Sequence, residues 1–238
     1  EFGYGNGVMT AEVPEKNLLA VLQSNPAEHP RRGEAAVRYA LEHPIGKPRL
    51  REIVRPGQRI AIVTSDVSRP MPSSAVLPAV LDELYAAGVD KRDITVVFAL
   101  GSHRRHTDEE RRRLAGERCF QEVRCIDGDP DDCIRMGTTS RGTPVDVTRV
   151  VAQADIRICL GNIEFHYFAG YSGGAKAILP GVSSREAIQS NHRLMTAKDA
   201  CAGKLDGNPI REDIEEGGAI CGIDYILNVI LDEHKQIV

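Results

Sequence analysis

The chain has 238 residues and a formal net charge of −4, with 42% hydrophobic and 27% charged residues. This length and balance are typical of a globular protein with a sizeable buried core, and they exclude a disordered or fibrous chain. The mild negative charge gives no electrostatic reason to expect nucleic acid or an anionic membrane as a partner.

The pattern before residue 59 predicts mostly loops, with one helix at Ala35–His43. From there the apolar spacing changes and predicts strands that alternate with helices. The predicted strands are Arg59–Thr64, Ile94–Leu100 and Asp155–Leu160, with a further candidate at Val145–Val147 and a short helix after it. The predicted helices are Ser73–Ala87, Thr107–Leu114, Ser184–Met195 and Ile210–Ile220. Thr107 is the expected N-cap of its helix, because Glu110 follows three positions later.

Strands that alternate with helices are typical of βαβ units. We therefore expect an α/β fold, Rossmann-like, with a doubly wound, mainly parallel sheet and helices on both faces. The end of the chain predicts an unfinished hairpin: a strand at Ile226–Leu231, a turn at Asp232–Lys235 and an apolar start at Gln236–Val238. Natural domains rarely stop inside a hairpin, so we expect a fragment.

The six cysteines are scattered and form no CxxC pair. Such a pattern is typical of reduced thiols that serve as small hydrophobic side chains, and it predicts a cytoplasmic protein. No apolar run approaches the roughly 20 residues that a membrane span requires. The polar, glycine-rich start does not resemble a signal peptide. We expect no membrane partner.

Polar and glycine-rich segments follow three of the predicted strands. Asp66–Pro70 follows the first, Gly101–Thr107 the second, and Gly161–Gly181 the strand at Asp155–Leu160. Doubly wound sheets bind their ligands beyond the carboxyl ends of the strands. The sequence therefore predicts a site built from these three segments.

A glycine-rich stretch ending at Gly174 leads to Lys176. Its backbone amides suit a phosphate, although the same glycines also suit a tight connection. The GxxxxGK[ST] and GxGxxG patterns are absent, so neither an ordinary nucleoside triphosphate nor NAD is indicated. Lys176 is open to three interpretations: a phosphate-binding charge, a surface lysine or a covalent attachment point. A lysine desolvated among apolar residues loses its proton more readily and becomes nucleophilic.

Histidines and one Asp–Arg pair supply the other candidate chemistry. Neutral imidazole binds metals and moves protons near neutral pH, which makes candidates of His103, His106, His166 and His192. Their spacing lacks HExxH, so a conventional zinc hydrolase is not supported. Asp66 and Arg69 form either a local pair or a fork for a carboxylate or phosphate. We assign no chemical role to His29, His43 and His234.

Taken alone, these residues predict an α/β enzyme that binds a phosphorylated cofactor and uses histidine acid/base or metal chemistry. Four motifs then resemble those of the nickel-dependent lactate racemase family, in the same order and nearly the same spacing. They are DVSRP, GSHRRHT, H-x3-G-Y-S-G-G-x-K-x3-P-G and the later NH. The resemblance runs from about residue 3 to the end, and its block from His166 to His192 is the most specific part.

The resemblance implies a nicotinate-derived mononucleotide, attached to a lysine through a thioamide and holding nickel as a pincer. By this resemblance Lys176 is the attachment residue and His192 the protein ligand to nickel, a donor set that suits Ni(II). His103 and His166 are the implied acid/base pair. Contacts to cofactor or substrate are implied for Asp66, Arg69, Ser172, Gly173 and Gly174.

The implied activity is racemisation or epimerisation of a small 2-hydroxyacid. One histidine removes the hydroxyl proton while the Cα hydride moves to the cofactor, and the hydride then returns to the opposite face. The resemblance also implies cofactor-synthesis enzymes as loading partners. It further implies a second, C-terminal domain absent from this chain, so residues 1–238 are expected to form the cofactor-binding domain and to be inactive alone.

One departure from the family is visible, and two alternatives stay open. The family often has arginine where this chain has Ala175, which removes a contact for phosphate or carboxylate and leaves the substrate in doubt. One alternative is a non-catalytic domain that carries a cofactor or binds a metal. The other is a Schiff-base enzyme that joins pyridoxal phosphate to Lys176. The identity of the 2-hydroxyacid does not follow from these residues.

Overall fold

The computed structural model describes residues 1–4, 7–22 and 30–238. The chain divides into two compact units, Glu1–Pro30 and Arg31–Val238. The first unit contains an antiparallel hairpin of β1 (Phe2–Tyr4) and β2 (Gly7–Met9), and a short 3-10 helix, η1 (Glu15–Asn17). The second unit contains every residue predicted for the site.

A five-stranded parallel sheet forms the centre of the second unit. Its strands are β3 (Ile60–Ser65), β4 (Ile94–Ala99), β5 (Arg124–Asp127), β8 (Ile156–Asn162) and β11 (Tyr225–Val229). Their spatial order is β5-β4-β3-β8-β11, so the chain winds outward from β3 and then returns to its other side. This reversal is the doubly wound, Rossmann-like arrangement that the sequence predicts. It opens a crevice at the carboxyl ends of β3 and β8.

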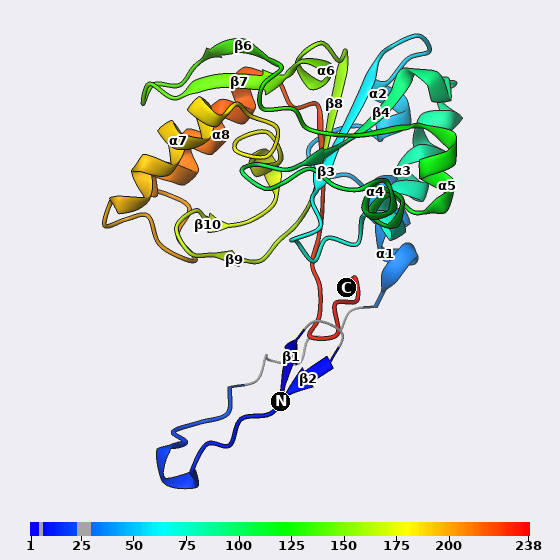
Figure 1. Cartoon of the computed structure of the whole chain (residues 1–238). Helices are drawn as coiled ribbons and strands as arrows, with labels where there is room; N and C mark the ends of the chain where they lie inside the picture. Colours follow the sequence, from blue (N-terminus) through cyan, green and yellow to red (C-terminus); the bar gives the residue numbers. More distant parts are fainter. Residues whose placement is uncertain (5–6, 23–29) are drawn as a thin grey trace. The chain divides into compact units, whose positions relative to one another are not determined.

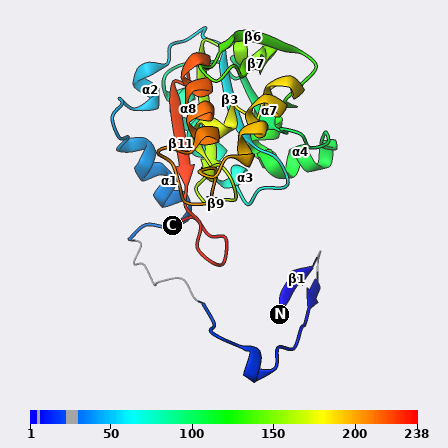
Figure 2. The ribbon, with the colours of Figure 1, turned by 90° about the vertical axis from the view of Figure 1, so that its left-hand side faces the viewer.

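Helices cover both faces of this sheet (Figure 1). One side carries α1 (Gly33–Glu42), α2 (Leu50–Ile53), α3 (Ser73–Ala86), α4 (Asp108–Ala115) and α5 (Glu117–Glu122). The other carries α6 (Arg149–Ala152), α7 (Arg185–His192), α8 (Pro209–Cys221) and a two-stranded antiparallel ribbon of β6 (Cys133–Thr138) and β7 (Pro144–Thr148). Figure 2, seen from the side of α7 and α8, shows these two helices in front of the sheet.

Shorter elements complete the second unit. They are the two-residue strands β9 (Phe165–His166) and β10 (Gly170–Tyr171) and the 3-10 helices η2 (Lys91–Asp93), η3 (Gly174–Ala177) and η4 (Arg193–Thr196). β9, β10 and η3 all lie between β8 and α7 in the chain. They therefore build the segment that follows the carboxyl end of β8.

The core explains why the strands are nearly continuous apolar runs. Successive side chains of a strand point to opposite faces of the sheet. Ile62 of β3 packs in one cluster with α1 and α3, whereas its neighbour Val63 packs in the other with β7 and α6. Phe98 and Val97 of β4 divide in the same way. Both faces are buried, and a parallel sheet covered on both faces needs apolar residues at every position.

The strand at Val145–Val147 corrects one prediction. It belongs to β7, which pairs antiparallel with β6 in a separate ribbon and is not part of the main sheet. All three residues are buried because the ribbon packs on the sheet face, so Val145 and Val147 resemble the apolar residues of a sheet strand. β5 and β6 were not predicted. β5 (RCID) is a four-residue edge strand with charged ends, and half-exposed β6 has no apolar run.

Most predicted helix boundaries are confirmed to within a few residues. Thr107 caps α4 by accepting the Glu110 N–H (3.2 Å), and the Glu110 carboxylate accepts the Thr107 N–H (2.9 Å). The predicted helix to Met195 instead ends at His192 and continues as a 3-10 turn. At the chain end, Leu231 and Ile237 form an antiparallel bridge, so the predicted hairpin is present.

The cysteine prediction is confirmed in its structural part. All six cysteines lie among the described residues and are free thiols, with Cys119, Cys159 and Cys221 buried in the core. In the described part of the chain, no helix combines the length and the apolar character needed to cross a membrane.

Candidate functional site

A cavity of about 210 Å³ lies at the carboxyl ends of β3, β4 and β8. This is the crevice where doubly wound sheets bind ligands. Eight of the residues singled out from the sequence line it: Asp66, Arg69, His103, His166, Ser172, Gly173, Lys176 and His192. Segments more than 100 residues apart in the chain therefore meet at one site. Gly174, the ninth, belongs to the same turn, and its N–H donates to Asn228 Oδ1 (3.2 Å).

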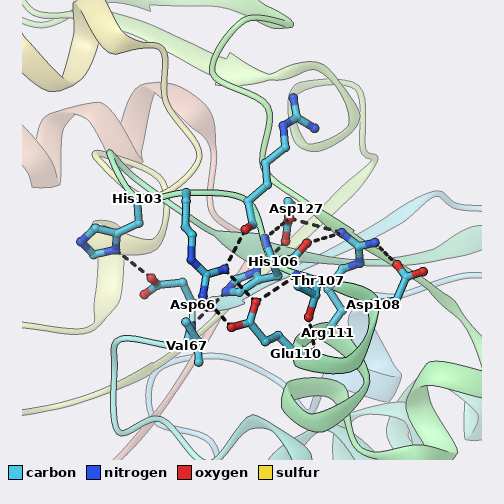
Figure 3. A network of polar contacts seen from close by, with 11 residues as sticks. Asp66, Val67, His103, His106, Thr107, Asp108, Glu110, Arg111 and Asp127 are labelled. Carbon is cyan, nitrogen blue, oxygen red and sulfur yellow. Dashed lines mark hydrogen bonds and ion pairs between the residues drawn. The ribbon is translucent and has the colours of Figure 1, made fainter.

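The first strand end holds His103 in a defined orientation. Nδ1 of His103 lies 2.7 Å from Asp66 Oδ2, and Ser68 Oγ donates to the other carboxylate oxygen of Asp66 (2.8 Å). Figure 3 shows this contact at the edge of a larger polar network. A carboxylate only accepts hydrogen bonds, so Nδ1 carries the proton and Nε2 keeps a free lone pair. That tautomer makes His103 a competent base.

Arg69 resolves the question that the sequence left open about Asp66. Asp66 pairs with His103, and within residues 1–4, 7–22 and 30–238 the Arg69 side chain has no carboxylate partner. The local Asp–Arg pair is therefore wrong. The Arg69 guanidinium lines the cavity as an uncompensated positive charge, which suits a carboxylate or a phosphate.

The glycine-rich turn approaches the end of β8 very closely. Gly173 has φ +78°, and a Cβ there would lie 2.8 Å from Asn228 Oδ1. A Cβ at Gly161 of β8 would lie 2.9 Å from Gly173 Cα. The Ser172 hydroxyl stabilises the turn itself, because it donates to the Asn162 carbonyl (2.6 Å) and accepts the Glu164 N–H (3.1 Å). The turn thus requires glycine for both backbone conformation and space.

Lys176 follows this turn in η3 and is largely desolvated. Its pKa is lowered from 10.5 to about 7, first by burial and then by the positive charges of Arg69 and Arg211, against a small opposing effect of Glu164. Desolvation favours the neutral amine of a lysine. At neutral pH a substantial fraction of Lys176 is therefore unprotonated and nucleophilic.

His166 and His192 face the cavity from either side of Phe168. The Phe168 ring makes edge contacts with both, at centroid distances of 4.6 Å to His166 and 5.4 Å to His192. Burial lowers the pKa of His166 to about 4, helped by the charges of Lys176 and Arg69. Burial also lowers the pKa of His192, with the Ile188 backbone opposing the shift. These shifts favour the neutral form of both rings.

The two rings also differ in which nitrogen is available. The Ala169 N–H donates to His166 Nδ1 (3.3 Å), which places the proton of this neutral ring on Nε2. His192 Nδ1 is buried and has no hydrogen-bond partner of good geometry. The nitrogen of His192 that can reach the cavity is therefore Nε2.

The three other histidines that the structure describes do not line the cavity. His106 is fully buried beneath it and bonds to Asp127 and Val67. His43 stacks on Tyr39, and His234 is exposed at the C-terminal turn. His29 lies outside the described residues.

Helix α8 and the end of α7 contribute residues that the sequence analysis missed. Asn191 is fully buried and lines the cavity, and its amide donates to Asp213 Oδ2 (2.8 Å). Arg211 donates to the Tyr171 carbonyl (3.0 Å) and pairs with Glu215, which places a positive charge behind the glycine turn. Asn191 had one signal, its place beside His192 in the motif, whereas Arg211 had none because the contacts of α8 are long-range.

Comparison with known proteins identifies the family of the chain. The family model described as the lactate racemase N-terminal domain matches residues 4–203. The chain belongs to this family.

The lactate racemase family supplies both sequence relatives and solved structures. The lactate racemase of Thermoanaerobacterium thermosaccharolyticum is 32% identical over 245 residues, covering 100% of this chain and 57% of the relative. That of Lactiplantibacillus plantarum is 33% identical over 242 residues, covering 99% and 57%. The chain thus spans just over half the length of these curated lactate racemases.

The chain likewise covers just over half the length of two similar solved structures. The lactate racemase apoprotein from T. thermosaccharolyticum superposes with a TM-score of 0.84 at 33% identity, covering 99% of this chain and 56% of that one. A protein from Thermotoga maritima superposes with a TM-score of 0.69 at 20% identity, covering 86% and 53%, and shows the fold alone.

Proposed function

We propose that this chain is the cofactor-binding part of a 2-hydroxyacid racemase or epimerase that uses a lysine-tethered nickel pincer nucleotide. The observation that carries the proposal is the convergence of His103, His166, Lys176 and His192 on one cavity, in a chain of the lactate racemase family. The substrate class is a small 2-hydroxyacid, such as lactate.

Three features of the site fit the proposed cofactor. Lys176 is desolvated and nucleophilic, as covalent attachment requires. The glycines of the turn before Lys176 let it pack closely against β8, which fixes where Lys176 enters the cavity. His192 presents Nε2 to the cavity, and its Nδ1 has no good partner. No three His, Cys, Asp or Glu side chains of the described residues are grouped to hold a metal, and a pincer brings its own sulfur and carbon ligands and needs one imidazole.

When bound, the pincer nucleotide supplies a carbon that accepts and returns the Cα hydride of the substrate. The protein handles the proton and the charge. His103, held by Asp66, accepts the substrate hydroxyl proton at Nε2. His166 serves the opposite face, and the reverse reaction exchanges the two roles. Arg69 binds the substrate carboxylate or the cofactor phosphate.

The low pKa of His166 makes it a weak base, and loading the cofactor would raise this pKa. Acylation of Lys176 removes one positive charge that lowers the pKa of His166, and an anion bound at Arg69 neutralises the second. Burial and the smaller effect of His192 then remain, so the pKa of His166 moves upward, towards the range where imidazole exchanges protons near neutral pH. The attachment lysine thereby tunes one of the two acid/base groups.

The test is to co-express the chain with cofactor-synthesis enzymes and to measure its intact mass and nickel content. A mass adduct is expected in the parent chain, and none in Lys176→Ala. Lys198→Ala, at an exposed lysine, is the matched control and keeps the adduct. His192→Ala is expected to keep the adduct but lose the nickel, whereas His166→Ala keeps both. An adduct on Lys176→Ala, or equal nickel loss from both histidine variants, would show the assignment to be wrong.

A further inference from the structure

His106 belongs to the motif of His103 but points the other way, into the protein (Figure 3). Its side chain is 0% exposed. Three hydrogen bonds hold the residue: Val67 N–H to Nε2 (3.1 Å), Nδ1 to Asp127 Oδ1 (2.6 Å), and its own N–H to Asp127 Oδ2 (2.8 Å). Phe98 packs edge-on against the ring at a centroid distance of 5.6 Å. A histidine that only filled space in the core would not need these three hydrogen bonds.

The partners determine which nitrogen of His106 carries the proton. A backbone N–H only donates, so Nε2 must offer its lone pair to Val67. Nδ1 must then carry the proton, and the Asp127 carboxylate accepts it. Asp127 is 2% exposed and also accepts from Arg111 Nη1 (3.3 Å). An imidazolium would place an N–H against the Val67 N–H, so only the neutral Nδ1–H tautomer satisfies all partners.

Val67 connects this buried pair to the cavity. Asp66, the preceding residue, accepts from His103 Nδ1 (2.7 Å) and lies at the start of the tight turn in which the Arg69 N–H donates to its carbonyl (3.2 Å). Anchoring the Val67 amide therefore fixes the position of the Asp66 carboxylate. The two histidines of the GSHRRHT motif are joined through the end of β3, in the order His103, Asp66, Val67, His106, Asp127.

We propose that His106 and Asp127 are positioning residues that hold the Asp66 carboxylate against His103, and so fix the tautomer and orientation of His103. The proposal concerns the geometry of this chain. Only its consequence for turnover rests on the proposed function. The competing interpretation, a purely structural core histidine, predicts effects on stability but none on His103.

The test uses 15N-histidine NMR of this chain to record the tautomers of His103 and His106, together with the hydrogen-exchange rate of the Val67 amide. The expected result is Nδ1–H for both rings and a protected Val67 amide. His106→Leu, which keeps the bulk but has no acceptor, should raise the Val67 exchange rate at least tenfold and mix the two tautomers of His103. His106→Gln, which restores an acceptor oxygen, should recover much of both.

A matched pair of carboxylate changes controls for folding. Asp127→Asn leaves too few acceptors for its three donors and should act like His106→Leu. Asp129→Asn, two residues further along the sequence, removes a carboxylate that pairs with Arg105. Asp129 takes no part in the contacts that lead from His103 to Asp127, so this variant should leave His103 unchanged. If His106→Leu fails to fold, Asp127→Asn and His106→Gln still decide the question. An Nε2–H tautomer for His106, or an unchanged His103 in folded Asp127→Asn, overturns the proposal.

Turnover distinguishes this proposal from the proposed function. In a cofactor-loaded protein extended by the part its relatives carry, His106→Leu should lower kcat at least tenfold and change KM less than about twofold. Absence of racemisation in the unsubstituted protein would refute the proposed function and leave the NMR result standing. Normal kcat in His106→Leu with a disturbed His103 tautomer would overturn the catalytic consequence alone.

Discussion

At the residue scale, Lys176 combines two properties that folding alone would not favour. It is half-buried near Arg69 and Arg211, and its pKa falls from 10.5 to about 7 because of desolvation first and these charges second. Burying a charge that lacks a partner is costly, so lysines are rarely placed this way without a function. Its position thus indicates reactivity retained at the expense of stability.

The first prediction follows from the sign of this shift. Between about pH 7 and 10.5 the unfolded chain binds more protons at Lys176 than the folded chain, so the contribution of Lys176 to the free energy of unfolding rises with pH in that window. Lys176→Met should therefore raise Tm at pH 6 by at least about 2–4 °C, the shift for roughly 1 kcal/mol in a chain of this size. The gain should shrink by pH 10. Differential scanning calorimetry at both pH values measures it.

Lys198→Met is the control, because Lys198 is exposed. It should show no difference between the two pH values. An equal change of Tm at pH 6 and pH 10 in Lys176→Met would contradict a lowered pKa at this residue.

The sequence predicted residues like Lys176 because they lie in a motif, and missed those whose role comes from distant contacts. Asp213 is fully buried and accepts from both Asn191 (2.8 Å) and Thr139 Oγ1 (2.5 Å). Nothing in its local pattern distinguishes it from an exposed acidic residue of α8. Arg211 is similar, since its charge matters only because α8 packs behind the glycine turn.

At the element scale, the central strands of the sheet were predictable from their apolar runs, whereas the edge strand β5 and the ribbon strand β6 were not. The apolar runs of β3, β4 and β8 follow from burial on both sides of the sheet. The four-residue edge strand β5 carries no such run. In β7 (PVDVT) only Val145 and Val147 are large and apolar, and this short pattern does not show which strand β7 pairs with.

The glycine turn before η3 gives the second prediction of this Discussion. Gly173→Ala introduces a Cβ 2.8 Å from Asn228 Oδ1 at φ +78°. The positive φ costs roughly 1–2 kcal/mol, and crowding at the strand end adds about 1–3 kcal/mol. Gly142→Ala is the matched control, because Gly142 has φ +82° and nothing within 4 Å of the new Cβ. The difference between the two variants isolates the close approach.

Urea unfolding of both variants measures this difference. Gly173→Ala should be the less stable by at least about 1 kcal/mol. It should also slow acylation of Lys176 by an amine-reactive probe at pH 7.5, since Lys176 depends on the turn for its position. Equal loss of stability in the two variants would mean that the turn tolerates a side chain against β8.

At the scale of the whole molecule, the cavity is open on one side. The His103 side chain is 48% exposed, whereas Asp66 behind it is buried. Among the described residues, Arg69 is the only arginine that lines the cavity. Small charged substrates are usually enclosed by groups from both sides of a cleft, and water in an open site weakens those contacts and competes with hydride chemistry.

The last prediction is that this chain carries the cofactor but does not racemise a 2-hydroxyacid by itself. The chain spans 57% of the length of the curated lactate racemases, so the groups that would close the site are expected in the remaining part of such proteins. The measurement compares turnover of enantiopure lactate by the loaded chain and by a loaded version extended by that part. We expect turnover by the shorter form to be at least a hundredfold lower, about 2.7 kcal/mol in the barrier. Comparable turnover would place the whole active site within residues 1–238, whereas the expected result makes closure over His103 a step of the reaction.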